Sequence, residues 1–100
     1  MKDASKHDER QLRRMLDCLD AARRGGVSLR AASDSLLFLR GALEDVDRGW
    51  ADDFTSHVAT LESASVASPS QVHDMGEEYP RLVKATLDAL EALVRARLGG

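Results

Sequence analysis

The chain is poor in cysteine, proline and aromatic residues, and it has no long apolar run. Its one cysteine, Cys18, excludes an intrachain disulfide and a cysteine-based zinc site. No apolar stretch approaches the roughly 20 residues that span a membrane, and residues 1–10 lack the apolar segment of a secretory signal. At 100 residues the chain is long enough to build one core. We therefore expect a cytoplasmic protein with a single domain over residues 1–100.

Leucine and alanine dominate the apolar residues, whereas aromatic residues make up 4% of the chain. This composition favours helix over sheet. Apolar residues recur at helical spacing in four segments, which predicts helices over residues 8–24, 29–45, 49–66 and 78–98. Residues 1–7 are expected to be disordered. The predicted fold is all-α, a small four-helix bundle with a single layer-on-layer core and short loops.

The predicted helix over residues 29–45 carries the most regular apolar pattern. Its seam has the spacing of heptad a and d positions and consists of Leu29, Ala32, Leu36, Leu39, Leu43 and Val46. Ser28 is its expected N-cap, and Asp47 is that of the next helix. Gly41 lies inside the helix, where a close helix crossing would explain it. Ser68 and the proline after it predict a short helical turn before the last helix.

The net charge of −3 is unevenly distributed. Residues 1–24 carry seven basic and five acidic groups, a net charge of +2. Residues 25–79 carry three basic and ten acidic groups, a net charge of −7. Residues 80–100 carry four basic and two acidic groups, again a net charge of +2. Such asymmetry can mark an interaction surface. Alternatively, basic outer helices fold back beside the acidic middle and neutralise it. The sequence leaves both interpretations open.

Negative charge is concentrated in residues 44–53, which we call the acidic corner. This segment joins two predicted helices and holds five carboxylates, one arginine and the only tryptophan. Asp47 as a cap, and Asp52 and Asp53 in the first turn of the following helix, suit the helix dipole. Trp50 fits either the core or an interface. Capping chemistry therefore accounts for part of the acidic corner.

Two carboxylates of the acidic corner lack such an explanation. Glu44 and Asp45 are predicted to lie at the C-terminal end of the preceding helix, where the dipole disfavours negative charge. This excess predicts a surface that attracts a basic protein. The expected binding residues are Glu44, Asp45, Asp47, Trp50, Asp52 and Asp53.

The chain lacks the residue patterns of an enzyme or a metal site. Asp53 and His57 are four residues apart, but zinc or iron needs three or four ligands. Cys18 has apolar neighbours along its helix and is expected to be a half-buried structural thiol, with its pKa slightly lowered by Arg14. No phosphate-binding glycine loop or nucleophile elbow is present. We expect no catalytic residues, no metal and no cofactor.

Several short motifs lie along the chain: G-x-V-S-L from Gly26, L-E-D-V-D from Leu43, Trp50 followed by Phe54, and a later L-E at Leu61. Together they resemble the pattern of a family of small, mostly uncharacterised bacterial all-α proteins. The last helix, with its L-V-x-x-x-L-x-x-L spacing, is similar too. In size and acidity these proteins are similar to immunity proteins that neutralise bacterial toxins. The resemblance thus implies an inhibitor that occludes a basic surface of its partner.

The favoured function is non-enzymatic binding of a basic protein, such as a bacterial toxin, through the acidic corner. One alternative is a helical scaffold protein that forms a homodimer through the seam in residues 29–46. Another is a small regulator that binds nucleic acid through Arg13, Arg14, Arg23 and Arg24. The acidic composition, and the position of the aromatic residues in the acidic half, favour the protein partner over nucleic acid.

Overall fold

The computed structural model describes residues 5–99, which form five α-helices and no strand. They are α1 (Lys6–Arg23), α2 (Leu29–Ala42), α3 (Arg48–Ser65), the short α4 (Pro69–Met75) and α5 (Glu78–Arg97). The all-α prediction is confirmed. None of these helices has the length and apolar composition needed to cross a membrane.

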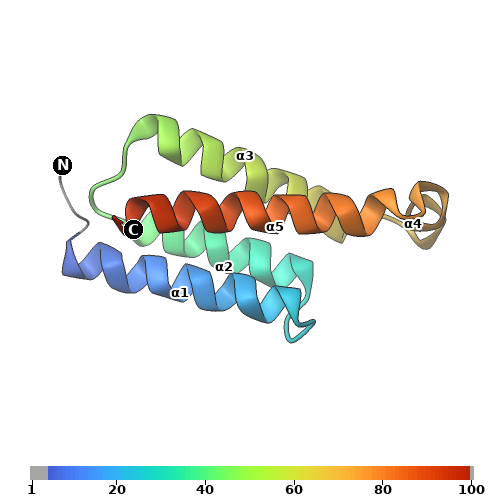
Figure 1. The fold of residues 1–100 in the computed structure, drawn as a ribbon, viewed down its shortest axis with the longest axis horizontal. Coiled ribbons are helices and arrows are strands. Elements are labelled where there is room, and N and C mark those ends of the chain that lie inside the picture. The colour runs from blue at the N-terminus through green and yellow to red at the C-terminus, as the bar shows by residue number, and fades with distance from the viewer. Residues whose placement is uncertain (1–4, 100) are drawn as a thin grey trace.

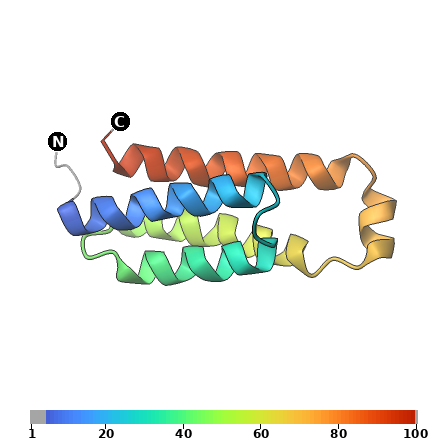
Figure 2. The same ribbon diagram turned by 90° about the horizontal axis from the view of Figure 1, so that it is seen from below.

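The four long helices lie side by side and alternate in direction (Figure 1). α1 packs on α2, α2 on α3, α3 on α5, and α5 closes the circle against α1. α4 lies beyond one end of this arrangement and contacts only α5 among the described helices (Figure 2). The connection between α2 and α3 lies at the opposite end, close to the start of α1 and the end of α5 (Figure 1).

The core is built from the apolar stripes of the long helices. Its fully buried members include Leu12, Met15 and Leu19 from α1, Leu36 from α2, Phe54, Val58 and Leu61 from α3, and Leu90 and Val94 from α5. The seam predicted in residues 29–46 belongs to this core. Ala32, Leu36 and Leu39 are buried, while Leu29, Leu43 and Val46 are partly buried against it. The seam therefore holds the chain's own helices together.

Polar side chains fix where four of the helices begin. Ser5, Ser28, Asp47 and Ser68 each accept a hydrogen bond from a backbone N–H in the first turn that follows. These bonds satisfy donors that have no partner inside a helix. The caps predicted at Ser28 and Asp47 are confirmed, and the turn at Ser68 is the start of α4. The prediction that residues 1–7 are disordered is wrong from Ser5 onward, and residues 1–4 lie outside the described residues.

Two helix boundaries bear on the acidic corner. α2 was expected to reach residue 45 but ends at Ala42, with Leu43 as its extended C-cap. Glu44 and Asp45 therefore follow the helix instead of forming its last turn. α3 begins at Arg48, so Asp52 and Asp53 lie past its first turn. The helix-dipole explanation predicted for these two aspartates is therefore wrong, because the effect falls off beyond the first turn.

Candidate functional site

The backbone of the acidic corner is held by Asp8, a residue from the start of α1. The Asp8 carboxylate is 1% exposed and accepts hydrogen bonds from the backbone N–H groups of Glu44, at 2.8 Å, and Asp45, at 3.0 Å. A buried carboxylate needs such donors, and hydrogen bonds to a charged acceptor are among the stronger ones in proteins. Asp8 thus cross-links two segments that lie far apart in the sequence.

Two more side chains bind this connection from the terminal helices. His7 Nε2 donates to the carbonyl oxygen of Ala42 at 2.8 Å, because a carbonyl only accepts. Arg97, at the end of α5, donates to the carbonyl oxygen of Asp45 at 2.6 Å. The path of the chain through the acidic corner is therefore fixed from both sides, as the closeness of α1 and α5 at this end allows (Figure 1).

Trp50, inside the acidic corner, packs into the core. Its side chain is 8% exposed and stacks on Phe54 with ring centroids 5.0 Å apart. The indole N–H donates to the carbonyl oxygen of Leu93 in α5 at 2.7 Å, which gives the buried polar group a partner. Trp50 is therefore a core residue that joins α3 to α5.

The other five predicted binding residues are exposed, and the structure gives them different roles. Asp47 caps α3 by accepting from the backbone N–H of Trp50 at 3.0 Å. Within the described residues, the carboxylates of Glu44, Asp52 and Asp53 form no hydrogen bond or ion pair. These three side chains carry the surface charge of the acidic corner that is not compensated by the fold.

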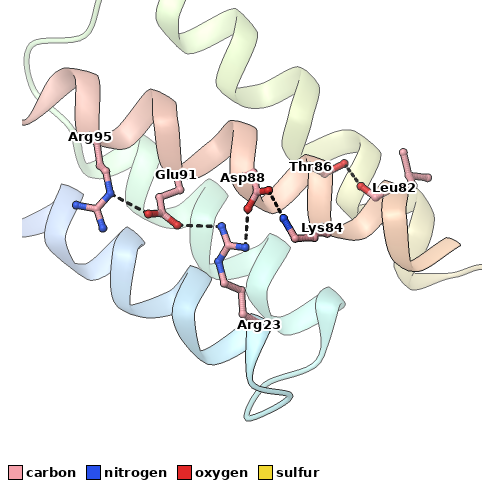
Figure 3. A network of polar contacts seen from close by, with 7 residues as sticks. All are labelled: Arg23, Leu82, Lys84, Thr86, Asp88, Glu91 and Arg95. Atoms are coloured by element: carbon pink, nitrogen blue, oxygen red, sulfur yellow. Dashed lines mark hydrogen bonds and ion pairs between the residues drawn. The ribbon is translucent and has the colours of Figure 1, made fainter. Parts of the chain in front are cut away.

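Several basic residues of α1 and α5 pair with carboxylates outside the acidic corner. Arg23 of α1 bridges Asp88, at 2.7 Å, and Glu91, at 2.9 Å, on α5 (Figure 3). Lys84 and Arg95 bind the same two carboxylates from within α5. Arg23, Lys84 and Arg95 are thus paired with carboxylates of α5, not with those of the acidic corner.

The ion pairs between α1 and α5 shift the protonation of their members. The pKa of Asp88 is lowered by its hydrogen bonds with Lys84 and then Arg23. The pKa of Glu91 is lowered in the same way, by Arg95 first and then Arg23. Burial alone would lower the pKa of Arg23, but its two carboxylate partners raise it. All three groups therefore stay charged over a wide pH range.

One group of potential metal ligands was missed by the sequence analysis. His7, Asp8 and Glu44 each offer a ligand atom, and these atoms lie within 4.8 Å of one another. No local pattern indicates this cluster, because Glu44 is brought to the start of α1 only by the fold. Both oxygens of Asp8 and Nε2 of His7 already bind the backbone of the α2–α3 connection. The cluster therefore serves the fold whether or not a cation joins it.

The remaining candidate residues fit structural roles. Cys18 is half-buried, and burial raises the pKa of its thiol, so the lowering expected from Arg14 is wrong. A raised pKa leaves less thiolate and makes the group a poor nucleophile. Arg13 pairs with Glu9 and Arg24 with Asp20 on the same helix.

Comparison with family models, with curated proteins and with solved structures found no match to this chain. The resemblance to small bacterial helical proteins therefore stays a prediction.

Proposed function

We propose that the chain binds a basic protein through the acidic corner and acts without chemistry of its own. The observation that carries this proposal is the set of three exposed carboxylates, Glu44, Asp52 and Asp53, which have no partner in the described residues. Uncompensated charge of one sign speeds association with a partner of the opposite sign and aligns it during encounter.

The rigidity of the acidic corner supports the same proposal. The backbone of the acidic corner is held by hydrogen bonds with Asp8, His7 and Arg97. The start of α3, which carries Asp52 and Asp53, is held by the stacking of Trp50 on Phe54. A surface that is already ordered loses little conformational entropy when it binds. An exposed loop without these contacts would be a poorer recognition element.

The sharpest form of the proposal is an immunity-type inhibitor. A toxin that acts on nucleic acid needs a basic surface to hold its substrate, and an acidic protein docked there would exclude the substrate. The size and acidity of the chain agree with this role. The partner would be a bacterial toxin, the complex would be stoichiometric, and the setting would be the cytoplasm.

The two alternative functions have less support. The seam proposed for homodimer formation packs in or against the chain's own core, with Ala32, Leu36 and Leu39 buried there, which leaves little of it for a second chain. Of the four arginines proposed to bind nucleic acid, Arg13, Arg23 and Arg24 form ion pairs with carboxylates of the chain. Nucleic acid would have to compete with these pairs, and the acidic corner would repel its phosphates.

The test is affinity capture from extracts of the cell that makes the protein. The bait chains are the native protein and the variant Glu44→Lys/Asp52→Lys/Asp53→Lys, which changes side chains without partners in the described fold. We expect the native chain to retain a basic protein that the variant loses.

A matched control separates the acidic corner from net charge. Glu62→Lys/Asp74→Lys/Glu78→Lys makes the same charge change at exposed carboxylates outside the corner. The control should retain the same partner. If both triple variants lose it equally, or neither does, the acidic corner is not the binding surface.

A further inference from the structure

The surface between α1 and α2 holds a feature that the proposed function does not use. An open groove of about 570 Å³ runs there, and Cys18, Val27 and Leu39 contribute to its lining. Phe38 of α2 forms part of its wall and is 76% exposed, the most exposed large apolar side chain among the described residues. An apolar ring exposed to water is unfavourable relative to a buried one. The groove and a ring that could fill such a groove therefore lie on one face.

Gly41 lies three residues after Phe38 and so on the same side of α2. A Cβ atom added to Gly41 would meet nothing within 4 Å, so the close intramolecular crossing expected from the sequence is absent. Glycine inside a helix is unfavourable relative to alanine. Nothing within the described chain requires that residue, whereas a helix packing from outside onto α2 would use the space.

The charges around the groove are of both signs. Arg14, Asp17 and Asp34 line it and form no ion pair with other described residues. A twofold-symmetric contact places each patch against its own copy, so a charged surface that pairs with itself needs groups of both signs. The acidic corner does not meet this condition, because two copies of it would repel. The groove does, with one positive and two negative groups.

We infer that the α1–α2 face binds a second copy of this chain, with Phe38 of each copy seated in the groove of the other. Phe38 and the groove that it lines belong to one surface, as a symmetric interface requires, and the two Phe38 rings would pack near each other. The groove volume is several times that of a phenyl ring, so one ring fits with room for neighbouring side chains. This dimer uses the outer face of α2, not its seam, and leaves the acidic corner free. It is independent of the proposed function.

Sedimentation equilibrium of the native chain over about 5 µM to 1 mM is the first test. We expect a monomer–dimer equilibrium with a dissociation constant of about 10–100 µM, typical of a small interface. Phe38→Ala should weaken the dimer roughly 100-fold, since each copy loses its anchor and each anchor is worth about tenfold. Val66→Ala, which removes another exposed apolar side chain far from the groove, should leave the constant unchanged.

Charge reversal gives a second, independent readout. Arg14→Asp makes all three charged groups of the groove negative and should abolish the dimer at the same concentrations. The circular dichroism of both groove variants should match that of the native chain, because Phe38 and Arg14 are exposed.

Cys18 offers a third readout, since it is one of the residues that line the groove. Labelling by a maleimide at about pH 8.5, where the raised pKa still allows reaction, should slow as the native protein concentration rises through the dissociation constant. In Phe38→Ala the labelling rate should not depend on concentration. A native chain that stays monomeric to about 1 mM overturns the inference, and so does a dimer that Phe38→Ala and Val66→Ala affect equally.

Discussion

At the scale of single residues, Asp8 joins the start of α1 to the α2–α3 connection. It is a charged side chain among the most buried in the described structure, and it is tolerated there because two backbone N–H groups bind it. The sequence indicated only that Asp8 lies near a helix start. Its role could not be predicted locally, because its partners are more than thirty residues away.

Replacing Asp8 by alanine should lower the free energy of unfolding by about 2–4 kcal/mol, because two backbone donors lose a charged acceptor in a buried place. Urea unfolding followed by circular dichroism measures the change. Glu9→Ala, at the exposed neighbouring carboxylate, should cost less than about 0.5 kcal/mol. Equal effects of the two substitutions would show that Asp8 does not hold the α2–α3 connection.

Replacing Gly41 by alanine should raise the free energy of unfolding by about 0.5–1 kcal/mol. The backbone at Gly41 has an ordinary negative φ and the added Cβ meets no atom, so only the entropy of the unfolded chain changes. Thermal unfolding at low protein concentration tests this in the monomer. A destabilised variant would mean that the space beside α2 is filled.

At the scale of elements, α1 and α5 are joined on their surface by Arg23 and its two carboxylate partners (Figure 3). The sequence showed basic and acidic groups in both segments but not which would meet. Helical periodicity predicts the face of a helix and leaves its neighbour undetermined, because neighbour choice depends on the packing of all helices at once.

The contribution of this contact to the free energy of unfolding should decrease at acidic pH. The folded pKa values of Asp88 and Glu91 are lowered, so their contribution is complete above their ordinary pKa. It is lost as the pH falls through the lower folded values. Urea unfolding of native chain and Arg23→Gln across this range should show a shallower acid slope in the variant. Arg24→Gln, whose partner lies on its own helix, is the control, and an unchanged slope in Arg23→Gln would contradict the account.

α4 should open more easily than the long helices. It has no buried residue and packs only on α5, whereas the long helices share one core. Local opening follows the density of buried contacts, so amides of α4 should exchange with solvent at least about 100-fold faster than those around Leu36 and Leu90. Hydrogen exchange followed by NMR measures this. Equal protection in α4 and α2 would show that α4 is part of the cooperative core.

At the scale of the whole molecule, the sequence predicted the helical class, the approximate bounds of the long helices and the caps at Ser28 and Asp47. It did so because these features depend on local periodicity and on hydrogen bonds within one turn. It misplaced the end of α2 at residue 45, because the chain leaves the helix at Leu43 to reach Asp8, a contact outside the local pattern.

The candidate site changed with the fold. Glu44 and Asp45 now have a structural setting, since their backbone is bound by Asp8. Asp52 and Asp53 no longer have the predicted structural explanation, because α3 begins at Arg48 and both lie past its first turn. Trp50 lies in the core. Among the described residues, the carboxylates of Glu44, Asp52 and Asp53 have no partner, and no local pattern separates these three from the other acidic residues.

The most direct test of the central claim is the affinity for the captured basic partner, measured by titration calorimetry at low and at physiological salt. The native chain should bind more weakly at higher salt, because exposed charges are screened. Glu44→Lys/Asp52→Lys/Asp53→Lys should bind at least about tenfold more weakly, with a flatter salt dependence. An affinity and salt dependence that match those of the native chain would contradict the claim that the acidic corner binds the partner.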